Sequence, residues 1–399
     1  MSKKELIHAI GAYLNDDVLD ENPDWLKFSY SWASSLEDTQ EIHVIYETNQ
    51  TDGDLSEHRT CTLPIVRNKS SNGSNSRESS MYLKVIPEMQ HGENNVRFGP
   101  RFIHMNETFV LLEDLTVRDY RSINGHTGMG LNLAQAALRK MAHFHAASMV
   151  YLKGENSTDF IPSVSALISN EDVETRMDIA IEMIEKHLPE FEEITTKLRS
   201  YLETFQKRLT DLLLKQNLPY KVIALGDASL KNMLHKFNEC DVPDVVFKNF
   251  NACFVGSVGY DLNIFFNTSL SLTEFALHRF ELLRYYYQNL KEVLSSKKFR
   301  APDWQTIVDE VREFEHIGCY ALLCEMPTCF VNNLKKWVVV QDSAIKDECF
   351  EEDYDALFKN EEATKLLKYG LERFYELFLW DDKAEEETKQ EEGFGFIKL

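Results

Sequence analysis

The stretch that decides the fold runs from Lys221 to Phe266 and reads KVIALGDASLKNMLHKFNECDVPDVVFKNFNACFVGSVGYDLNIFF. It contains two short apolar runs, each typical of a buried β-strand. The first run ends at Gly226-Asp227 and the second ends at Asn249. Asn232 follows Asp227 with four residues between them. This spacing, followed by a second strand with a polar end, is typical of a catalytic loop and a metal-binding turn.

Such a pair of polar segments suits phosphoryl transfer. That reaction needs a cation on the nucleotide phosphates, metal ligands, and a carboxylate that orients or deprotonates the acceptor hydroxyl. Asp227 suits the last role because the glycine before it lets the backbone turn sharply, and the carbonyl oxygen of Asn232 is a candidate magnesium ligand. A Gly-Asp pair at a strand end is by itself usually an ordinary turn. The spacing, the flanking strands and Asp261 together favour the catalytic interpretation.

Two earlier segments carry further candidates. The run at 81–86 predicts a strand with Lys84 in its middle, where a charge is costly unless it is paired. Lys84 is therefore either an outward-facing edge residue or a lysine that contacts the α- and β-phosphates of a nucleotide. Glu113 and Asp114 follow the strand predicted at 108–112 and form either a solvated turn or a hinge whose backbone hydrogen-bonds adenine.

Length, charge and cysteine usage narrow the function classes. The 399 residues can hold a large core, and the formal net charge of −22 argues against nucleic acid and anionic membrane surfaces as partners. The sequence contains no apolar run of about 18 residues, so it predicts no transmembrane helix. The charged N-terminus does not predict a signal peptide. The 7 scattered cysteines form no zinc-site pattern and indicate free thiols in a reducing cytoplasm.

The order of predicted elements indicates an α+β, two-lobed chain. In the N-terminal part we expect a short helix at 4–15, strands at 41–46 and 60–66, and a polar, disordered loop at 67–80. Pro64 suggests that the second of these strands lies at an edge, and residues 87–107 show no helical periodicity. Helical periodicity covers 131–152, 171–188, 191–214, 272–295, 303–315 and 354–380, with His145 as a core residue of the first of these. We expect an N-lobe at 1–115, a helical C-lobe at 116–380 and an acidic, disordered tail at 381–399.

The sequence resembles the ecdysteroid kinase-like (CHK kinase-like) family of arthropods, which is related to choline kinases and aminoglycoside phosphotransferases. The resemblance lies in MYLKVIP, FVLLEDLTVRDY, MAHFHAAS, LGDASLKNML and DVVFKNFNACFVGSVGYDLNIFF, and extends from about residue 81 to 380. It implies a bilobal, protein-kinase-like fold that uses ATP and Mg²⁺ to phosphorylate a small-molecule alcohol, typically a steroid hydroxyl. We expect a cytoplasmic monomer.

The resemblance also assigns roles to single residues. Asp227 would be the catalytic aspartate, and Asp261 would brace the catalytic loop. Asn232 and Asn249 would be the metal ligands. Lys84 would contact the phosphates, and Glu113, Asp114 and Leu115 would form the hinge.

Several positions depart from the family pattern. Leu225 replaces the histidine of His-Gly-Asp, Ser229 replaces a tryptophan, and Lys231 replaces the first residue of an Asn-Asn pair. Asn249 stands where the family has the aspartate of Asp-Phe-Gln. The last change removes a full negative charge from the metal site, so weaker binding of magnesium is expected.

The N-lobe departs as well. Only 28 residues separate Lys84 from Glu113, and they do not predict the helix whose glutamate pairs with the lysine; Glu88 and Glu93 are the nearest candidates. Residues 32–41, expected to cover the nucleotide, contain no glycine. A degraded active site and a missing segment both explain these differences. The main hypothesis is an ATP-dependent phosphotransferase, and the alternatives are a catalytically impaired pseudokinase that binds a ligand or partner and a helical scaffold with an acidic tail.

Overall fold

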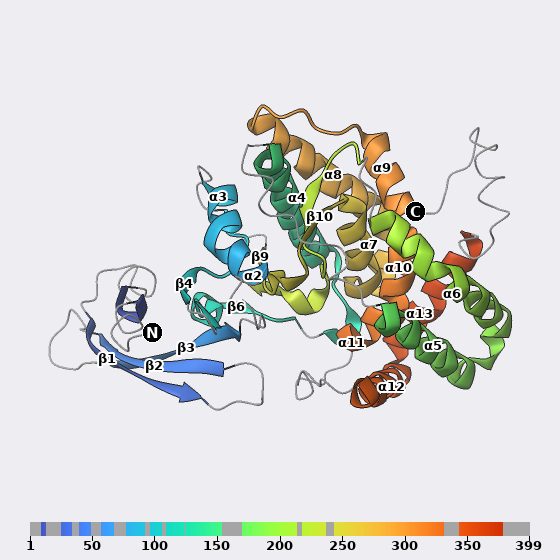
Figure 1. The fold of residues 1–399 in the computed structure, drawn as a ribbon, viewed down its shortest axis with the longest axis horizontal. Helices are drawn as coiled ribbons and strands as arrows, with labels where there is room; N and C mark the ends of the chain where they lie inside the picture. The colour runs from blue at the N-terminus through green and yellow to red at the C-terminus, as the bar shows by residue number, and fades with distance from the viewer. Residues whose placement is uncertain are drawn as a thin grey trace.

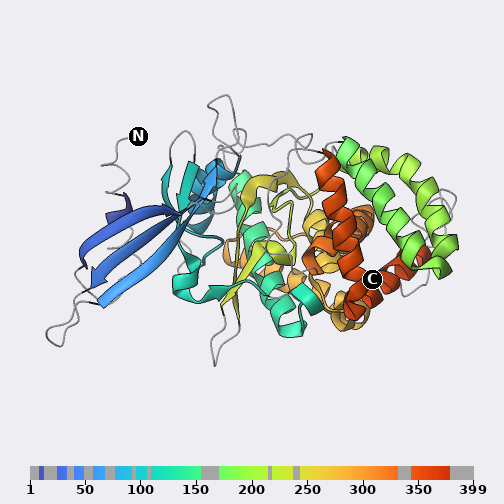
Figure 2. The ribbon, with the colours of Figure 1, turned by 90° about the horizontal axis from the view of Figure 1, so that it is seen from below.

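The protein consists of a β-sheet at one end and a larger, mostly helical part beside it (Figures 1 and 2). A computed structural model describes residues 9–12, 25–33, 40–48, 57–67, 77–91, 96–105, 109–123, 125–153, 170–213, 218–236, 243–330 and 343–377. Residues 9–12 are helical, and the rest of the helix predicted at 4–15 lies outside the described residues. The nucleotide-covering loop predicted at 32–41 also falls mainly outside them, as does the acidic tail. The α+β prediction is confirmed.

The N-terminal sheet is antiparallel, in the order β1-β2-β3-β5-β4. Its strands are β1 (Trp25–Ala33), β2 (Gln40–Thr48), β3 (Glu57–Arg67), β4 (Phe102–Met105) and β5 (Phe109–Leu112), which confirms the strands predicted at 41–46, 60–66 and 108–112. β3 is not an edge strand of the sheet as a whole. However, β5 pairs only with Ile65 to Arg67, so in the described part of the sheet Pro64 is paired on the β2 side alone. A residue without an N–H requires this arrangement.

The segment after β3 is helical, which corrects the prediction of a strand at 81–86. It comprises α2 (Arg77–Ser80), the π-helical turn η2 (Met81–Val85) and α3 (Ile86–Gln90). Its buried apolar residues recur at helical spacing, namely Met81, Tyr82, Val85, Ile86 and Met89, whereas Leu83 and Lys84 are exposed. A short apolar run does not distinguish a strand from a buried helix face. Residues 77–80 likewise correct the loop predicted at 67–80, of which 68–76 lie outside the described residues.

The order strand, helix, strand, strand therefore runs from β3 to β5. The helix expected between Lys84 and the hinge is not missing, because it lies around Lys84 itself. The explanation by a missing helix is therefore wrong for this part of the chain, and the degraded active site stays a hypothesis.

The helical part is built around α4 (Leu131–Lys153), which packs against α8 (Arg279–Ser296) and the strand β7 (Val222–Ala224). The other elements are η3 (Leu115–Arg118), β6 (Tyr120–Arg121), η4 (Gly125–Thr127), α5 (Asn170–His187), η7 (Pro189–Phe191), α6 (Glu192–Leu213), η8 (Leu230–Asn232), β8 (Met233–Lys236), β9 (Asp244–Phe247), η9 (Phe250–Ala252), β10 (Phe254–Gly256), α7 (Val258–Ser269), η10 (Glu274–His278), α9 (Trp304–Glu313), α10 (Glu315–Tyr320), η11 (Ala321–Glu325), α11 (Met326–Phe330), α12 (Ser343–Lys359) and α13 (Glu361–Glu376).

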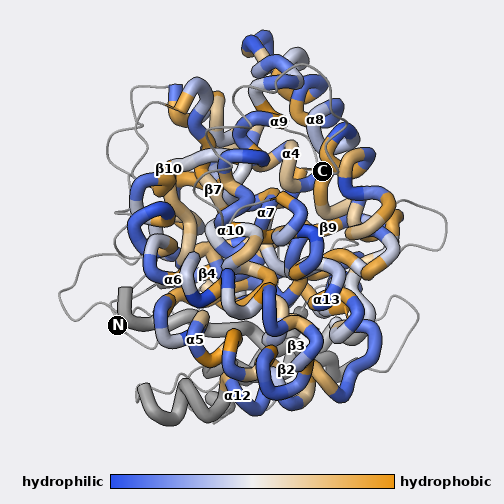
Figure 3. The backbone as a smooth tube through the Cα atoms, turned by 90° about the vertical axis from the view of Figure 1, so that its right-hand side faces the viewer, coloured by the Kyte–Doolittle hydropathy of each residue, from blue (hydrophilic) through white to orange (hydrophobic). Residues whose placement is uncertain are grey.

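The predicted long helices are confirmed by α4, α5, α6, α8 and α9. The described part of the segment predicted at 354–380, residues 354–377, contains two helices, because Asn360 ends α12 and its side chain caps α13. Figure 3 looks onto α5, α6 and α13, where hydrophilic and hydrophobic residues alternate along each helix. None of the described helices is long and apolar enough to span a membrane.

Two small antiparallel sheets carry the segments that the sequence singles out. One pairs β7 with β10, and the other has the order β6-β8-β9. The predicted strands at 222–225 and 245–247 are thereby confirmed. They belong to different sheets, and α4 lies against both β7 and β9, so the loop after β7 and the turn after β9 come together.

Candidate active site

The loop that carries Asp227 depends on a glycine. Gly226 has φ +77°, and a Cβ atom there would lie 2.0 Å from the backbone oxygen of Ala252. Only glycine meets both conditions without displacing the chain. The close approach fixes the loop after β7 against η9, the turn that follows Asn249.

Asp261 holds this loop from inside the helical part. Its fully buried carboxylate accepts hydrogen bonds from the backbone N–H groups of Leu225 (2.6 Å) and Gly226 (3.0 Å). Nε2 of His145 lies 2.9 Å from the same carboxylate, and Nδ1 of His145 lies 2.7 Å from the hydroxyl of Tyr286. These contacts are those of a bracing residue, and they confirm His145 as a buried core histidine with both ring nitrogens satisfied.

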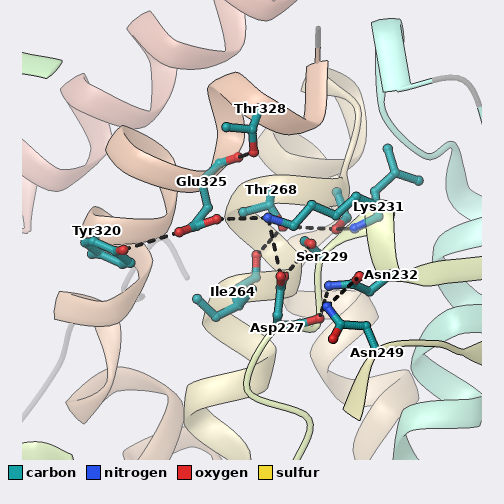
Figure 4. Close-up of polar contacts among 12 residues, drawn as sticks. Asp227, Ser229, Lys231, Asn232, Asn249, Ile264, Thr268, Tyr320, Glu325 and Thr328 are labelled. Carbon is teal, nitrogen blue, oxygen red and sulfur yellow. Dashed lines mark hydrogen bonds and ion pairs between the residues drawn. The ribbon is translucent and has the colours of Figure 1, made fainter. Parts of the chain in front are cut away.

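Both carboxylate oxygens of Asp227 have partners (Figure 4). The hydroxyl of Ser229 donates to Oδ1 at 2.5 Å, and Nζ of Lys231 lies 3.3 Å from Oδ2. Because a carboxylate oxygen accepts more than one hydrogen bond, Asp227 still has room for a hydroxyl group. Its side chain is 23% exposed, so it can meet a ligand.

Lys231 links Asp227 to a chain of alternating charges that ends in the helical part. Its ammonium lies 3.0 Å from Oε2 of Glu325, whose Oε1 pairs with Arg176 at 2.9 Å and accepts from Tyr320. Burial alone would raise the pKa of Glu325, but Lys231 and Arg176 lower it to about 2. Burial would lower the pKa of Lys231, but Asp227 and Glu325 raise it above its ordinary value. Lys231 and Glu325 are thus charged at neutral pH, and with Asp227 and Arg176 they form a row of alternating basic and acidic groups.

Asn232 and Asn249 lie side by side next to this loop. Nδ2 of Asn232 donates to the backbone oxygen of Asp227 at 3.1 Å, and Nδ2 of Asn249 lies 3.5 Å from Oδ1 of Asn232. Asn249 has φ +65°, in the left-handed region that asparagine tolerates. The fold therefore brings together the two residues that the resemblance assigned to a metal.

The donor set nevertheless does not fit magnesium. Mg²⁺ is normally held by one or two carboxylates, whereas Asn232 and Asn249 are neutral amides and the carboxylate of Asp227 is balanced by Lys231. Within the described residues there is no group of three His, Cys, Asp or Glu side chains that could hold a metal ion.

The connection between the two parts follows β5. Glu113 is 1% exposed, and its carboxylate pairs with Arg97 and, at 3.0 Å, with Arg118. The same carboxylate accepts a hydrogen bond from the backbone N–H of Arg101 at 2.6 Å. The side chain of Asp114 accepts from the backbone N–H of Thr116 at 2.8 Å and begins η3. These side chains hold the connection in place, so the alternative of a solvated turn is wrong.

Leu115 lies on the inner side of this connection. It packs with Tyr120 and with Val246 of β9, and Leu234 of β8 packs against the same cluster. The apolar group brings the start of the C-terminal part next to the strand that ends at the asparagine turn.

Lys84 does not lie where its predicted role requires. Its side chain is exposed on η2, a helical turn, so the strand on which the phosphate-contact assignment depended does not exist. The sequence reasoning also missed Glu78, which is 3% exposed on α2, and α2 lies against η9. Glu78 precedes Tyr82 by one helical turn, and that spacing could have revealed it.

Lys248 is a second residue that the sequence reasoning missed. Its backbone N–H donates to the oxygen of Asn232 at 3.0 Å, directly before Asn249. Burial lowers the pKa of its half-buried ammonium, and no charged group in the described part of the chain compensates for that burial. Its place in the sequence, directly before Asn249, is the signal that could have revealed it.

Comparison with known proteins gives one family match. The model described as "Ecdysteroid kinase-like family" matches residues 67–299. A search of curated proteins found no match.

Several solved structures are distantly similar. The streptomycin–ATP complex of APH(2″)-IIa has 12% identity and a TM-score of 0.38, covering 81% of this chain and 99% of that chain. An ethanolamine kinase of Plasmodium vivax has 10% identity and a TM-score of 0.40, covering 88% and 89%. The GDP complex of aminoglycoside 2′-phosphotransferase-IIIa has 15% identity and a TM-score of 0.37, covering 88% and 98%.

Proposed function

Because the chain belongs to the ecdysteroid kinase-like family, we propose that it moves the γ-phosphoryl group of ATP to a hydroxyl group of a small molecule. The observation that carries this proposal is the braced loop: Asp261 fixes the backbone at Leu225 and Gly226, which presents Asp227 at a partly exposed position. A position fixed in this way is what general-base and orienting residues need.

Asp227 would receive the acceptor hydroxyl. The hydroxyl donates a hydrogen bond to the carboxylate, and its oxygen attacks the γ-phosphorus in line with the leaving β,γ-bridging oxygen. A new P–O bond forms, the bond to the bridging oxygen breaks, the proton passes to Asp227, and ADP leaves. Lys231 lies 3.3 Å from Asp227, so it would hold the carboxylate in place for the hydroxyl. No step is assigned to magnesium, because the amide pair does not fit it.

The nucleotide would lie at the connection between the two parts, with adenine beside Glu113 to Leu115. The buried contacts of Glu113 and Leu115 fix the backbone of this connection, and a fixed backbone suits hydrogen bonding to a purine ring. The acceptor would approach Asp227 from the side of Glu325. The resemblance suggests a steroid-type alcohol as the acceptor.

The test combines binding and turnover. Mg-ATP and metal-free ATP are each titrated into the protein while its melting temperature is followed, and ADP release is then measured with a panel of hydroxylated acceptors. We expect Asp227→Asn to retain the nucleotide-induced shift and to lose at least about a hundredfold in turnover. Asp303→Asn is the matched control, because Asp303 is exposed and its side chain makes no capping hydrogen bond. The absence of any shift with every nucleotide, with or without metal, would refute the proposal.

A second candidate function is binding without turnover. It is favoured by the amide pair at Asn232 and Asn249 and by the ion pair that engages Asp227. Wild-type protein that binds ATP but phosphorylates none of the acceptors, with Asp227→Asn binding equally well, would support this pseudokinase function.

A further inference from the structure

Lys248 extends the strand pairing of β9 into the candidate active site. Met233 is opposite Phe247 in the β8–β9 ladder, and the hydrogen bond from Lys248 N to Asn232 O continues that ladder by one residue. The backbone of Lys248 is thereby fixed to the loop that carries Asp227. Its side chain leaves a defined position rather than a free turn.

Strand alternation decides which way that side chain faces. Successive side chains of a strand point to opposite faces, and residues two apart share a face. Val246 faces Leu115 and Leu234, at the connection between the two parts of the chain. Phe247 faces the opposite side, where its ring meets that of Phe144 in the main core. Lys248 therefore shares the face of Val246, toward the proposed nucleotide position.

The charges around Lys248 favour an anionic ligand. Lys231 is balanced by Asp227 and Glu325, at 3.3 and 3.0 Å, whereas no carboxylate among the described residues lies within ion-pair distance of the Lys248 ammonium. Its neighbours Asn232 and Asn249 are neutral. A half-buried ammonium without a counter-charge is poorly stabilised until an anion supplies one.

The strand next to the helical segment offers no competing lysine. The sequence of β3, EHRTCTLPIVR, contains no lysine, and Lys84 is exposed on η2. We propose that Lys248, from the end of β9, is the residue that contacts the phosphate groups of the nucleotide. This inference rests on the proposed function, since it names the group that would hold the same nucleotide.

The experiment compares ATP with adenosine, which lacks the phosphates, in the presence of EDTA. Isothermal titration of the wild-type chain should give at least about tenfold tighter binding of ATP than of adenosine. Lys248→Met should remove most of that difference and leave adenosine binding unchanged, and Lys248→Arg should retain it in part. Lys207→Met is the matched control, because Lys207 is exposed on α6 and should behave as wild type.

The outcomes separate the inference from the function on which it rests. ATP affinity that is unchanged in Lys248→Met, or lost in Lys84→Met instead, would overturn the role of Lys248 while leaving the phosphotransferase proposal in place. A wild-type chain that binds neither ATP nor adenosine, with and without magnesium, would overturn the function itself and the inference with it.

Covalent labelling of the wild-type chain gives a second measurement that needs no variant to fold. In an ATP analogue acylated on its γ-phosphate, the amine of a nearby lysine attacks the acyl carbon. An amide forms, the acyl–oxygen bond breaks, and ATP and a proton leave. Peptide mass spectrometry should locate the label on Lys248, in an amount that excess ATP reduces. ATP-sensitive labelling of other lysines without Lys248 would contradict the proposal.

Discussion

The hydrogen bonds of Asp261 give the sharpest prediction about the site. Oδ1 accepts from Gly226, and Oδ2 accepts from both Leu225 and His145. In Asp261→Asn, an NH₂ group replaces one of the two oxygens, and in either orientation it meets a backbone N–H. His145 can change its tautomer to accept from an amide, but a backbone N–H cannot. One buried donor is therefore left without an acceptor in every arrangement.

The size of the effect follows from this count. A buried donor without an acceptor costs about 1 to 3 kcal/mol, and loss of the negative charge weakens the two remaining bonds by about 0.5 to 1 kcal/mol each. The total is about 3 kcal/mol, or more than a hundredfold in the folding equilibrium. Because the weakened bonds hold the loop before Asp227, turnover should fall as well.

Urea denaturation at pH 7, followed by circular dichroism, measures the stability change. Asp261→Asn should lower the urea midpoint with an unchanged slope, and the exposed Asp303→Asn should stay within about 0.5 kcal/mol of wild type. A midpoint for Asp261→Asn that matches this control would refute the bracing role. Stability that falls while turnover is retained would mean that the brace supports the core but not the catalytic loop.

Three further changes test other parts of the structure. Gly226→Ala should destabilise the chain by at least about 2 kcal/mol in urea denaturation, because its Cβ meets the backbone of Ala252 at positive φ, whereas Gly130→Ala, with open space around it, should not. Burial lowers the pKa of His235 to about 4, against an opposing contribution from a nearby carboxylate, so the stability gained from its neutral form is complete above the unfolded pKa of about 6.5 and is lost as the pH falls toward 4. His235→Gln should therefore make the urea midpoint depend less on pH between about 6.5 and about 4, and a profile as steep as that of wild type would contradict this. Asn249→Asp should make ATP binding at least about tenfold tighter with Mg²⁺ than with EDTA in calorimetric titration, and an affinity that does not respond would place the metal site elsewhere.

The sequence predicts those features whose signal is local. The long helices and the strand at 41–46 can be recognised from a single segment each, because the spacing of apolar residues within that segment identifies its buried face. The segment at 81–86 fails for the same reason: six residues fit a strand and a helix face equally well. The buried pattern becomes decisive only when Met89, outside that window, is included.

The site divides along similar lines. The motif around Asp227 locates the loop and the asparagine turn, because their spacing within one stretch is fixed by the fold. The ion pair of Lys231 with Glu325 joins residues 94 positions apart, and His145 lies 116 positions from Asp261. No pattern within a single sequence reveals such contacts, since they depend on how distant helices pack.

The charges explain why the motif alone does not decide activity. Asp227 and Glu325 bring two negative charges, and Lys231 and Arg176 bring two positive ones, so these four groups leave no surplus carboxylate to attract a divalent cation. A nucleotide that enters next to Asn249 therefore meets neutral amides and lysine side chains rather than carboxylates. Its phosphates would be held by cations of the chain itself, and the acceptor hydroxyl would have to share Asp227 with Lys231. If the ion pair keeps Asp227 from the acceptor, the protein binds nucleotide without turnover, and if a hydroxyl can displace Lys231, the transfer can proceed.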